Sequence, residues 1–279
     1  MIALAGVPGV ASAGRFAITG PSLADPTLDG GFGWVMAAGD FDGDGHEDLA
    51  VSAPWANPNA DGTYAGAVYL YDDVEQWEGG DPSVTLTSGT DRVDFAWLLS
   101  AADLNGDGVD DLVYVDYDDG FDSPSNRVSV VFGQSEWSQG GLTATSVVPG
   151  ASSLGSVDAS GEATGDGIAD VLVSASNSDP SGDAFIFPGS SVGLTSFPPI
   201  ALIDGGGGRW AYAGDMDGDG LDDIVNDVAY FFGPVDGTLG PDTVLDEPGD
   251  LGGGAATRGG DINGDGYADV LWTSYMGEY

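Results

Sequence analysis

The sequence contains no cysteine and no lysine, and His46 is its single histidine. Without cysteine the chain has no disulfide and no thiolate, so neither can support the fold or bind a metal. Five arginines face 46 acidic residues, which gives a formal net charge of −41. Such a surface repels polyanions, and this excludes nucleic acid and anionic membrane surfaces as partners. No apolar run reaches the roughly 18 residues of a membrane-spanning helix, and we expect no membrane insertion.

The same absences narrow the chemistry that the chain could catalyse. With no cysteine, no lysine and one histidine, the usual nucleophiles and general bases are reduced to carboxylates, tyrosines and serines. The serine-rich stretches match no nucleophile motif. Paired acids could still act as in a glycosidase, but nearly every clustered acid has another explanation, given below. We therefore expect no catalytic residue in this chain.

The sequence is rich in one acidic nine-residue pattern, which occurs five times and each time runs into a short apolar strand. The clearest copy reads DFDGDGHED and continues as LAVS. The five copies, called loops 1 to 5, span residues 40–48, 103–111, 162–170, 215–223 and 261–269. Loop 3 is degenerate, because Glu162 and Thr164 replace its first two aspartates.

The spacing of oxygen donors in these loops predicts calcium. Calcium prefers about six to eight oxygen ligands, and side chains at positions 1, 3 and 5 can surround one side of the ion. Glycine at position 6 permits a backbone with positive φ, so that the carbonyl of position 7 can turn toward the same centre. The acid at position 9 completes the shell. The predicted ligands, with position 7 acting through its carbonyl, are Asp40, Asp42, Asp44, His46, Asp48, Asp103, Asn105, Asp107, Val109, Asp111, Glu162, Thr164, Asp166, Ile168, Asp170, Asp215, Asp217, Asp219, Leu221, Asp223, Asp261, Asn263, Asp265, Tyr267 and Asp269.

No glutamate occupies position 12 of these loops, where the chain is already in a strand. The pattern therefore predicts strand-loop-strand calcium sites, not EF-hands. A single copy could be an ordinary solvated turn, since Asp, Asn and Gly are common turn residues, but five copies argue against that alternative. Loop 3 could be occupied or empty, so we expect four or five Ca²⁺ ions. They would offset about ten units of negative charge, which indicates a structural role.

Calcium also supplies an expectation about location. Extracellular calcium modules commonly have dissociation constants of about 10⁻⁴ to 10⁻³ M, and cytosolic calcium is too scarce to fill such sites. We expect a secreted or cell-surface protein. The first 12 residues lack the positively charged region of a signal peptide and contain Pro8, so we expect that any export signal is missing from this sequence.

The spacing between the loops predicts an all-β fold. The loops begin at residues 40, 103, 162, 215 and 261, at intervals of 63, 59, 53 and 46 residues. Each interval contains short apolar stretches with strand periodicity, and 48 glycines and 15 prolines separate them. Four strands per interval, repeated along the chain, indicate a β-propeller.

These residues resemble the FG-GAP repeat. The resemblance rests on Phe-Gly at residues 32–33, the acidic loop ending in Asp-Leu at 48–49, Ala-Pro at 53–54 and Gly-x-Val-Tyr at 66–69. The chain is similar to the N-terminal β-propeller of integrin α subunits and to bacterial FG-GAP/VCBS proteins over nearly its whole length. The resemblance implies four-stranded blades, often seven in number, with calcium in the hairpin between the first two strands. Departures are Ala96 in place of glycine, the lack of Phe-Gly before loops 4 and 5, and loop 3.

We interpret residues 1–279 as one propeller region. The predicted blades are 32–94, 95–153, 154–206 and 207–252, with partial blades at 1–31 and 253–279. Both partial blades contain a second strand, so they overlap instead of completing one another. We therefore expect an incomplete piece of a larger, seven-bladed propeller.

Two functions stay open at this point. The first is an extracellular calcium-binding module for adhesion, with a protein or a glycan as its ligand, and the second is the propeller domain of a secreted calcium-dependent hydrolase or polysaccharide lyase.

Among the aromatic residues, we expect Trp34 and Trp97 to form a buried contact between blades. Trp77 and Trp137 would cap outer blade edges or, alternatively, expose rings to a ligand. We expect the His46 side chain to point to solvent.

Overall fold

The computed structural model describes residues 2–3, 17–18, 30–57, 65–74, 81–87, 94–117, 126–134, 144–147, 154–175, 184–192, 194, 200–202, 209–226, 229–235, 243–244 and 255–273. All regular elements within these ranges are β-strands. None of the described residues forms a helix that is long and apolar enough to cross a membrane. The expected all-β fold is confirmed.

The strands form four antiparallel sheets of four strands each, which we call blades 1 to 4. Blade 1 contains β3 (Met36–Gly39), β4 (Asp48–Ala53), β5 (Ala67–Tyr71) and β6 (Val84–Thr87). Blade 2 contains β7 (Leu98–Ala102), β8 (Asp111–Asp116), β9 (Arg127–Val131) and β10 (Ala144–Val147). Blade 3 contains β11 (Leu154–Gly161), β12 (Asp170–Ala175), β13 (Ala184–Phe187) and β14 (Ile200–Leu202). Blade 4 contains β15 (Ala211–Gly214), β16 (Asp223–Val225), β17 (Ala229–Phe231) and β18 (Thr243–Val244).

Two further sheets have two strands each in the described residues. The first pairs β1 (Ile2–Ala3) with β2 (Ala17–Ile18), and the second pairs β19 (Ala255–Gly260) with β20 (Asp269–Thr273). In every four-stranded blade the strands pair in the order in which they follow along the chain. This is the meander expected for a propeller blade.

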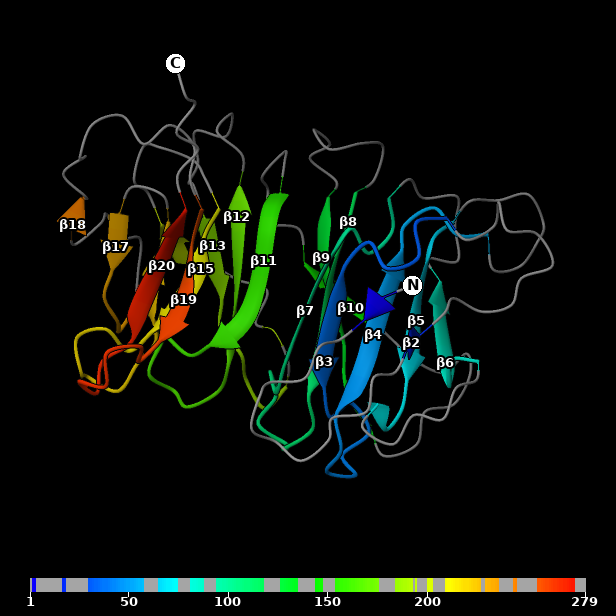
Figure 1. Ribbon diagram of the computed structural model, residues 1–279, viewed down its shortest axis with the longest axis horizontal. Coiled ribbons are helices and arrows are strands. Elements are labelled where there is room, and N and C mark those ends of the chain that lie inside the picture. Colours follow the sequence, from blue (N-terminus) through cyan, green and yellow to red (C-terminus); the bar gives the residue numbers. More distant parts are fainter. Residues whose placement is uncertain are drawn as a thin grey trace, which may run out of the picture.

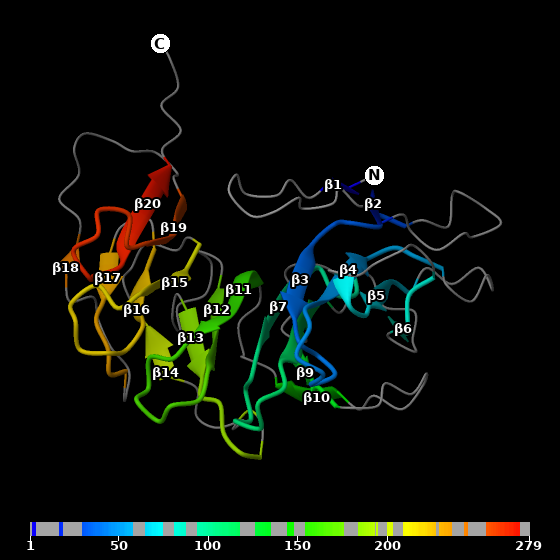
Figure 2. The same cartoon turned by 60° about the horizontal axis from the view of Figure 1, so that its bottom comes forward.

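The blades are arranged as in a β-propeller. Their first strands contact one another in succession, β3 with β7, β7 with β11, β11 with β15 and β15 with β19. Figures 1 and 2 show the blades following one another from blue to red around these first strands. The second strands β4 and β8 are buried along their full length, which explains their continuous apolar sequences.

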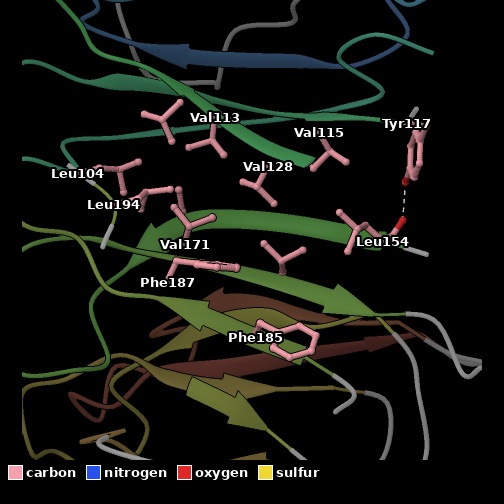
Figure 3. Close-up of a cluster of buried hydrophobic side chains, with 13 residues drawn as sticks. Leu104, Val113, Val115, Tyr117, Val128, Leu154, Val171, Phe185, Phe187 and Leu194 are labelled. Atoms are coloured by element: carbon pink, nitrogen blue, oxygen red, sulfur yellow. Dashed lines mark hydrogen bonds between the residues drawn. The ribbon is translucent and has the colours of Figure 1, made fainter. Parts of the chain in front are cut away.

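The hydrophobic core lies between the blades. One cluster joins β8 and β9 of blade 2 to β11, β12 and β13 of blade 3, with Val113, Val128, Val171 and Phe187 among its buried members (Figure 3). Similar clusters join blade 1 to blade 2 and blade 3 to blade 4. In Figure 3 the hydroxyl of Tyr117 donates a hydrogen bond to the Leu154 carbonyl across the first of these interfaces. Each blade therefore depends on its neighbours to cover its apolar faces.

All five acidic loops connect a first strand to a second strand in the same register. The residue at loop position 9 pairs with the residue just before position 1, as Asp48 does with Gly39 and Asp111 with Ala102. The same holds for loops 3, 4 and 5. Figure 1 shows these connections gathered along the lower edge of the molecule. The repeat in sequence is thus a repeat in space.

Candidate metal centres

Each acidic loop is closed by hydrogen bonds from its own backbone to the acid at position 1. In loop 1, Oδ1 of Asp40 accepts the N–H of Gly43 at 2.8 Å, and Oδ2 accepts the N–H of Gly45 at 2.9 Å. Asp103, Asp215 and Asp261 accept the equivalent pairs of hydrogen bonds in loops 2, 4 and 5. Gly45 at position 6 has a φ of 90°, and its four counterparts also have positive φ, as expected. The chain thus wraps around the first carboxylate.

The side chains at positions 3 and 5 form local turns. Oδ1 of Asp42 accepts the N–H of Asp44, and Oδ1 of Asp44 accepts the N–H of His46. The same two turns recur in loops 2, 4 and 5. These turns are typical of Asp and Asn, and each leaves the side-chain oxygens with lone pairs for further partners.

In loops 1 to 4 the acid at position 9 is buried and ties the loop to the end of the third strand of its blade, whereas Asp269 of loop 5 is partly exposed. Asp111 has no exposed surface; its Oδ2 accepts the N–H of Leu104 at 3.0 Å, and its Oδ1 accepts the N–H of Gly133 at 2.9 Å. Asp48, Asp170 and Asp223 are buried and bonded in the same way in loops 1, 3 and 4. Position 9 therefore holds a carboxyl group inside the protein.

Burial makes ionisation of these acids costly. It raises the pKa of Asp111 to about 7, although the N–H groups of Gly133 and Leu104 act in the opposite direction. It raises the pKa of Asp48, Asp170 and Asp223 to about 6 in each case, and it also raises the pKa of Asp42. A cation next to these groups would offset the cost of burying their charge.

Two loops bring three carboxylates into one group. Asp40, Asp42 and Asp48 offer oxygens that lie within 4.8 Å of one another in loop 1, and Asp215, Asp217 and Asp223 do so in loop 4. Loops 2 and 5 have asparagine at position 3, whose side chain also offers an oxygen. The donors are all oxygens, and such a set can hold a hard divalent cation.

Loop 3 keeps the backbone of the other loops but not their donor pattern. Glu162 at position 1 accepts the N–H of Gly165 and, at 3.3 Å, that of Asp166. The hydroxyl of Thr164 lies 3.3 Å from both Glu162 Oε1 and Asp170 Oδ1. A hydroxyl here links the two acids that a cation would otherwise bridge.

One acidic pair beside loop 1 is not part of the nine-residue pattern, and it was not predicted from the sequence. Asp72 and Asp73 follow β5 directly, and the charge of Asp72 contributes to the raised pKa of both Asp42 and Asp48. The signal was present in the sequence, because blades 2, 3 and 4 have glycine at the place of Asp73. Loop 1 therefore has a more acidic surrounding than its repeat pattern predicts.

Trp34 and Trp97 contact one another between blades, as predicted, but the prediction that this contact is buried is wrong. The rings of Trp34 and Trp97 lie 4.3 Å apart between blades 1 and 2. Trp34 is nevertheless 47% exposed. Trp55, itself 37% exposed, joins the pair with ring centroids 5.3 Å from Trp34 and 5.6 Å from Trp97, so the three rings cluster at the surface. Trp77 and Trp137 lie outside the described residues.

The acidic hairpins and the fold are similar to those of known proteins. The FG-GAP repeat family matches residues 32–71 and 253–279, which include loops 1 and 5. The chain contains FG-GAP repeats. The fold as a whole is similar to that of a rhamnogalacturonan lyase from Bacillus licheniformis, with a TM-score of 0.54, 14% identity, and coverage of 86% of this chain and 46% of the lyase. At that identity the likeness concerns the fold alone.

Part of the chain is similar to phosphatidylinositol-glycan-specific phospholipases D. The protein from Bos taurus is 35% identical over an alignment 132 residues long, which covers 39% of this chain and 16% of the relative. The protein from Homo sapiens is 42% identical over 87 residues, which is 30% of this chain and 10% of the relative. The match thus spans less than a fifth of these relatives' length.

Proposed function

We propose that this chain is a calcium-stabilised, non-catalytic FG-GAP module that binds an extracellular ligand, with Ca²⁺ in the acidic loops. The observation that carries the proposal is the buried acid at position 9, which recurs in loops 1 to 4 beside further oxygen donors. Burying a carboxylate without a cation destabilises the folded state, and a divalent ion bound beside the carboxylate would make a stabilising contact with it. The predicted calcium ligands listed above are the residues that would hold the ions.

The calcium contribution would be large relative to the stability of a domain. With a dissociation constant of about 0.1 mM and about 1 mM free calcium, each site adds about 1.4 kcal/mol. Four or five sites then add about 6 to 7 kcal/mol, which rivals the usual 5 to 15 kcal/mol of a folded domain. Such affinities suit a secreted or cell-surface protein, and this is the location we propose.

The exposed rings of Trp34 and Trp55 are the surface on which we place the ligand. They form a cluster with Trp97 and lie beside Asp94, whose Oδ1 accepts the indole N–H of Trp55. Packed rings with exposed faces provide large contact area at low cost in side-chain entropy. A glycan or a protein side chain could stack there. The net charge of −41 favours a neutral or cationic ligand over an acidic one.

A second candidate is the propeller domain of a secreted calcium-dependent hydrolase or polysaccharide lyase. The phospholipase D relatives, which are named for an enzymatic activity, favour it. In this case the present chain would support or position a catalytic domain and would contain no catalytic residue itself.

The experiment that tests the proposal is a screen of the purified chain against neutral glycans and extracellular proteins in about 2 mM calcium. We expect W34A/W55A to lose binding at temperatures where it stays folded, although its melting temperature falls because Asp94 loses the indole N–H of Trp55. V192A, which removes an 88% exposed apolar side chain elsewhere, serves as the control and should bind normally. Equal binding by W34A/W55A and V192A would contradict the placement of the ligand, and hydrolysis or eliminative cleavage of a substrate by the chain would contradict a non-catalytic role.

A further inference from the structure

Loop 1 carries a second group of donors, in which the calcium pattern uses the Asp44 side chain but neither the His46 imidazole nor Asp73. One carboxylate oxygen each from Asp44 and Asp73 and one imidazole nitrogen of His46 lie within 4.8 Å of one another. His46 is thus at the surface, as expected, but its ring also lies beside two acids. This group differs from the calcium loops in kind, because it combines nitrogen with oxygen.

Asp73 adds an independent observation. Its Oδ1 is fully buried and accepts no hydrogen bond from the described part of the chain. Leaving such an atom unsatisfied is costly, and in natural structures an ordered water, an ion or a ligand usually satisfies it. Asp73, which belongs to the group with Asp44 and His46, therefore has a buried oxygen free to accept a further partner.

The side chain of Asp73 is also not required by the hairpin. In blades 2 to 4 the backbone N–H that bonds to the position 9 acid comes from Gly133, Gly189 and Gly233. In blade 1 the same N–H comes from Asp73, which donates to Asp48 at 3.0 Å. Glycine can thus make this bond, and the carboxylate of Asp73 is an addition that is found only in blade 1 among the four described blades.

We propose that Asp44, His46 and Asp73 form a zinc site beside the calcium site of loop 1. Zinc binds imidazole nitrogen and carboxylate oxygen, and sites with three protein ligands keep an open position for water or a partner's donor. Ligand atoms on one zinc ion are about 3 to 4 Å apart, so even at the 4.8 Å limit of this group the atoms need to approach one another by only about 1 Å. Calcium prefers oxygen ligands and would not compete for the imidazole.

The two metals would share Asp44. Its Oδ1 accepts the N–H of His46, and Asp44 is also the predicted position 5 ligand of calcium. A carboxylate has enough lone pairs to serve both ions. We therefore expect zinc to bind while calcium occupies loop 1.

The test uses the full chain without an affinity tag, saturated with calcium and titrated with zinc. His46 is the single histidine, so one set of imidazole signals in a nitrogen-15 NMR spectrum reports on this site alone. We expect zinc to shift these signals at a stoichiometry of one ion, and D73N to lower the zinc affinity at least tenfold. Asn tolerates the positive φ of residue 73 as Asp does and keeps the backbone N–H, so the variant should fold.

E47Q is the matched control, because it removes one carboxylate charge at the exposed Glu47, which neighbours His46 in the sequence and belongs to neither donor group of loop 1. It should leave the zinc shift of His46 unchanged. Imidazole signals that do not move with zinc, or D73N binding zinc as tightly as the wild type, would overturn the proposal. Neither result would affect the calcium assignment, which is measured separately by the calcium-dependent rise in melting temperature.

Discussion

The carboxylate of Asp110 accepts a hydrogen bond from the backbone N–H of Asp40 at 3.0 Å, and the N–H of Asp110 donates to the carbonyl of Asp40 at 2.9 Å. This reciprocal pair joins position 8 of loop 2 to position 1 of loop 1 in the preceding blade. Asp222 and Glu162 repeat it between blades 4 and 3, at 3.0 Å and 2.8 Å. Two of the interfaces between blades are thus fixed at the acidic loops themselves.

Removing the side-chain hydrogen bond of this pair should destabilise the protein. In D110A the N–H of the partly buried Asp40 loses its acceptor, and we expect the free energy of unfolding to fall by about 1 to 3 kcal/mol. Denaturant unfolding in calcium measures the change. Glu47, at the same position of loop 1, is exposed, so E47A is the control and should change stability by less than about 0.5 kcal/mol. Equal effects of D110A and E47A would show that the pair contributes nothing.

The buried acid at position 9 should decide calcium binding at its loop. D111N keeps the shape of the side chain, but its NH₂ group cannot accept the N–H of Leu104 and carries no charge for the ion. We expect calorimetry to count one calcium ion fewer than in the wild type. We also expect the stability loss to be larger in calcium than in EGTA, since only the first condition includes the lost ion.

The same strand provides the control for D111N. Asp116 is a buried acid at the other end of β8, and its Oδ1 accepts the N–H of Ala96. D116N should lower stability equally in calcium and in EGTA and should leave the ion count unchanged. A full ion count in D111N would contradict the role given to position 9.

Calcium stabilisation should depend on pH. Burial raises the pKa of Asp48 to about 6 and that of Asp111 to about 7 from an ordinary value of 3.8. Without metal, the native state therefore binds protons more tightly than the unfolded state, and its stability falls as the pH rises from the ordinary pKa through these raised values. Calcium needs the ionised acids, so its benefit grows over the same range. Melting temperatures with and without calcium should converge near pH 5 and diverge near pH 8, and a constant difference would contradict the prediction.

A single substitution should strengthen loop 3. T164D places a carboxylate at position 3, as in loops 1 and 4, and removes the hydroxyl that links Glu162 to Asp170. We expect calcium affinity at this loop to rise, because the loop gains an acidic ligand. Calorimetry should detect either one more ion or one site with tighter binding. T164V, which removes the hydroxyl without adding charge, should show neither, and an unchanged T164D would mean that position 1 limits this loop.

The repeat pattern predicted much of this architecture because every copy has the same types of residue at the positions that determine the local backbone. Glycine at position 6 predicted positive φ, and the apolar runs predicted the buried strands β4 and β8. Individual contacts between blades could not be predicted in this way. Asp110 looks like any loop acid in the sequence, and only the packing of blade 2 against blade 1 brings it to Asp40.

The exposure of Trp34 escaped sequence reasoning for a similar reason. Its exposure depends on its packing against Trp97 of blade 2 and Trp55, which follows β4. Asp73 lies outside the nine-residue pattern, and only the pairing of β5 with β4 brings it to Asp48 of loop 1. Both lie at places where segments distant in sequence meet.

The most direct test of the account is thermal unfolding of the chain in about 2 mM calcium and in excess EGTA, with calorimetric counting of bound ions. The account predicts four or five ions and a large calcium-dependent rise in melting temperature. Identical melting curves, or the absence of calcium binding, would contradict it and would leave the five loops as solvated turns.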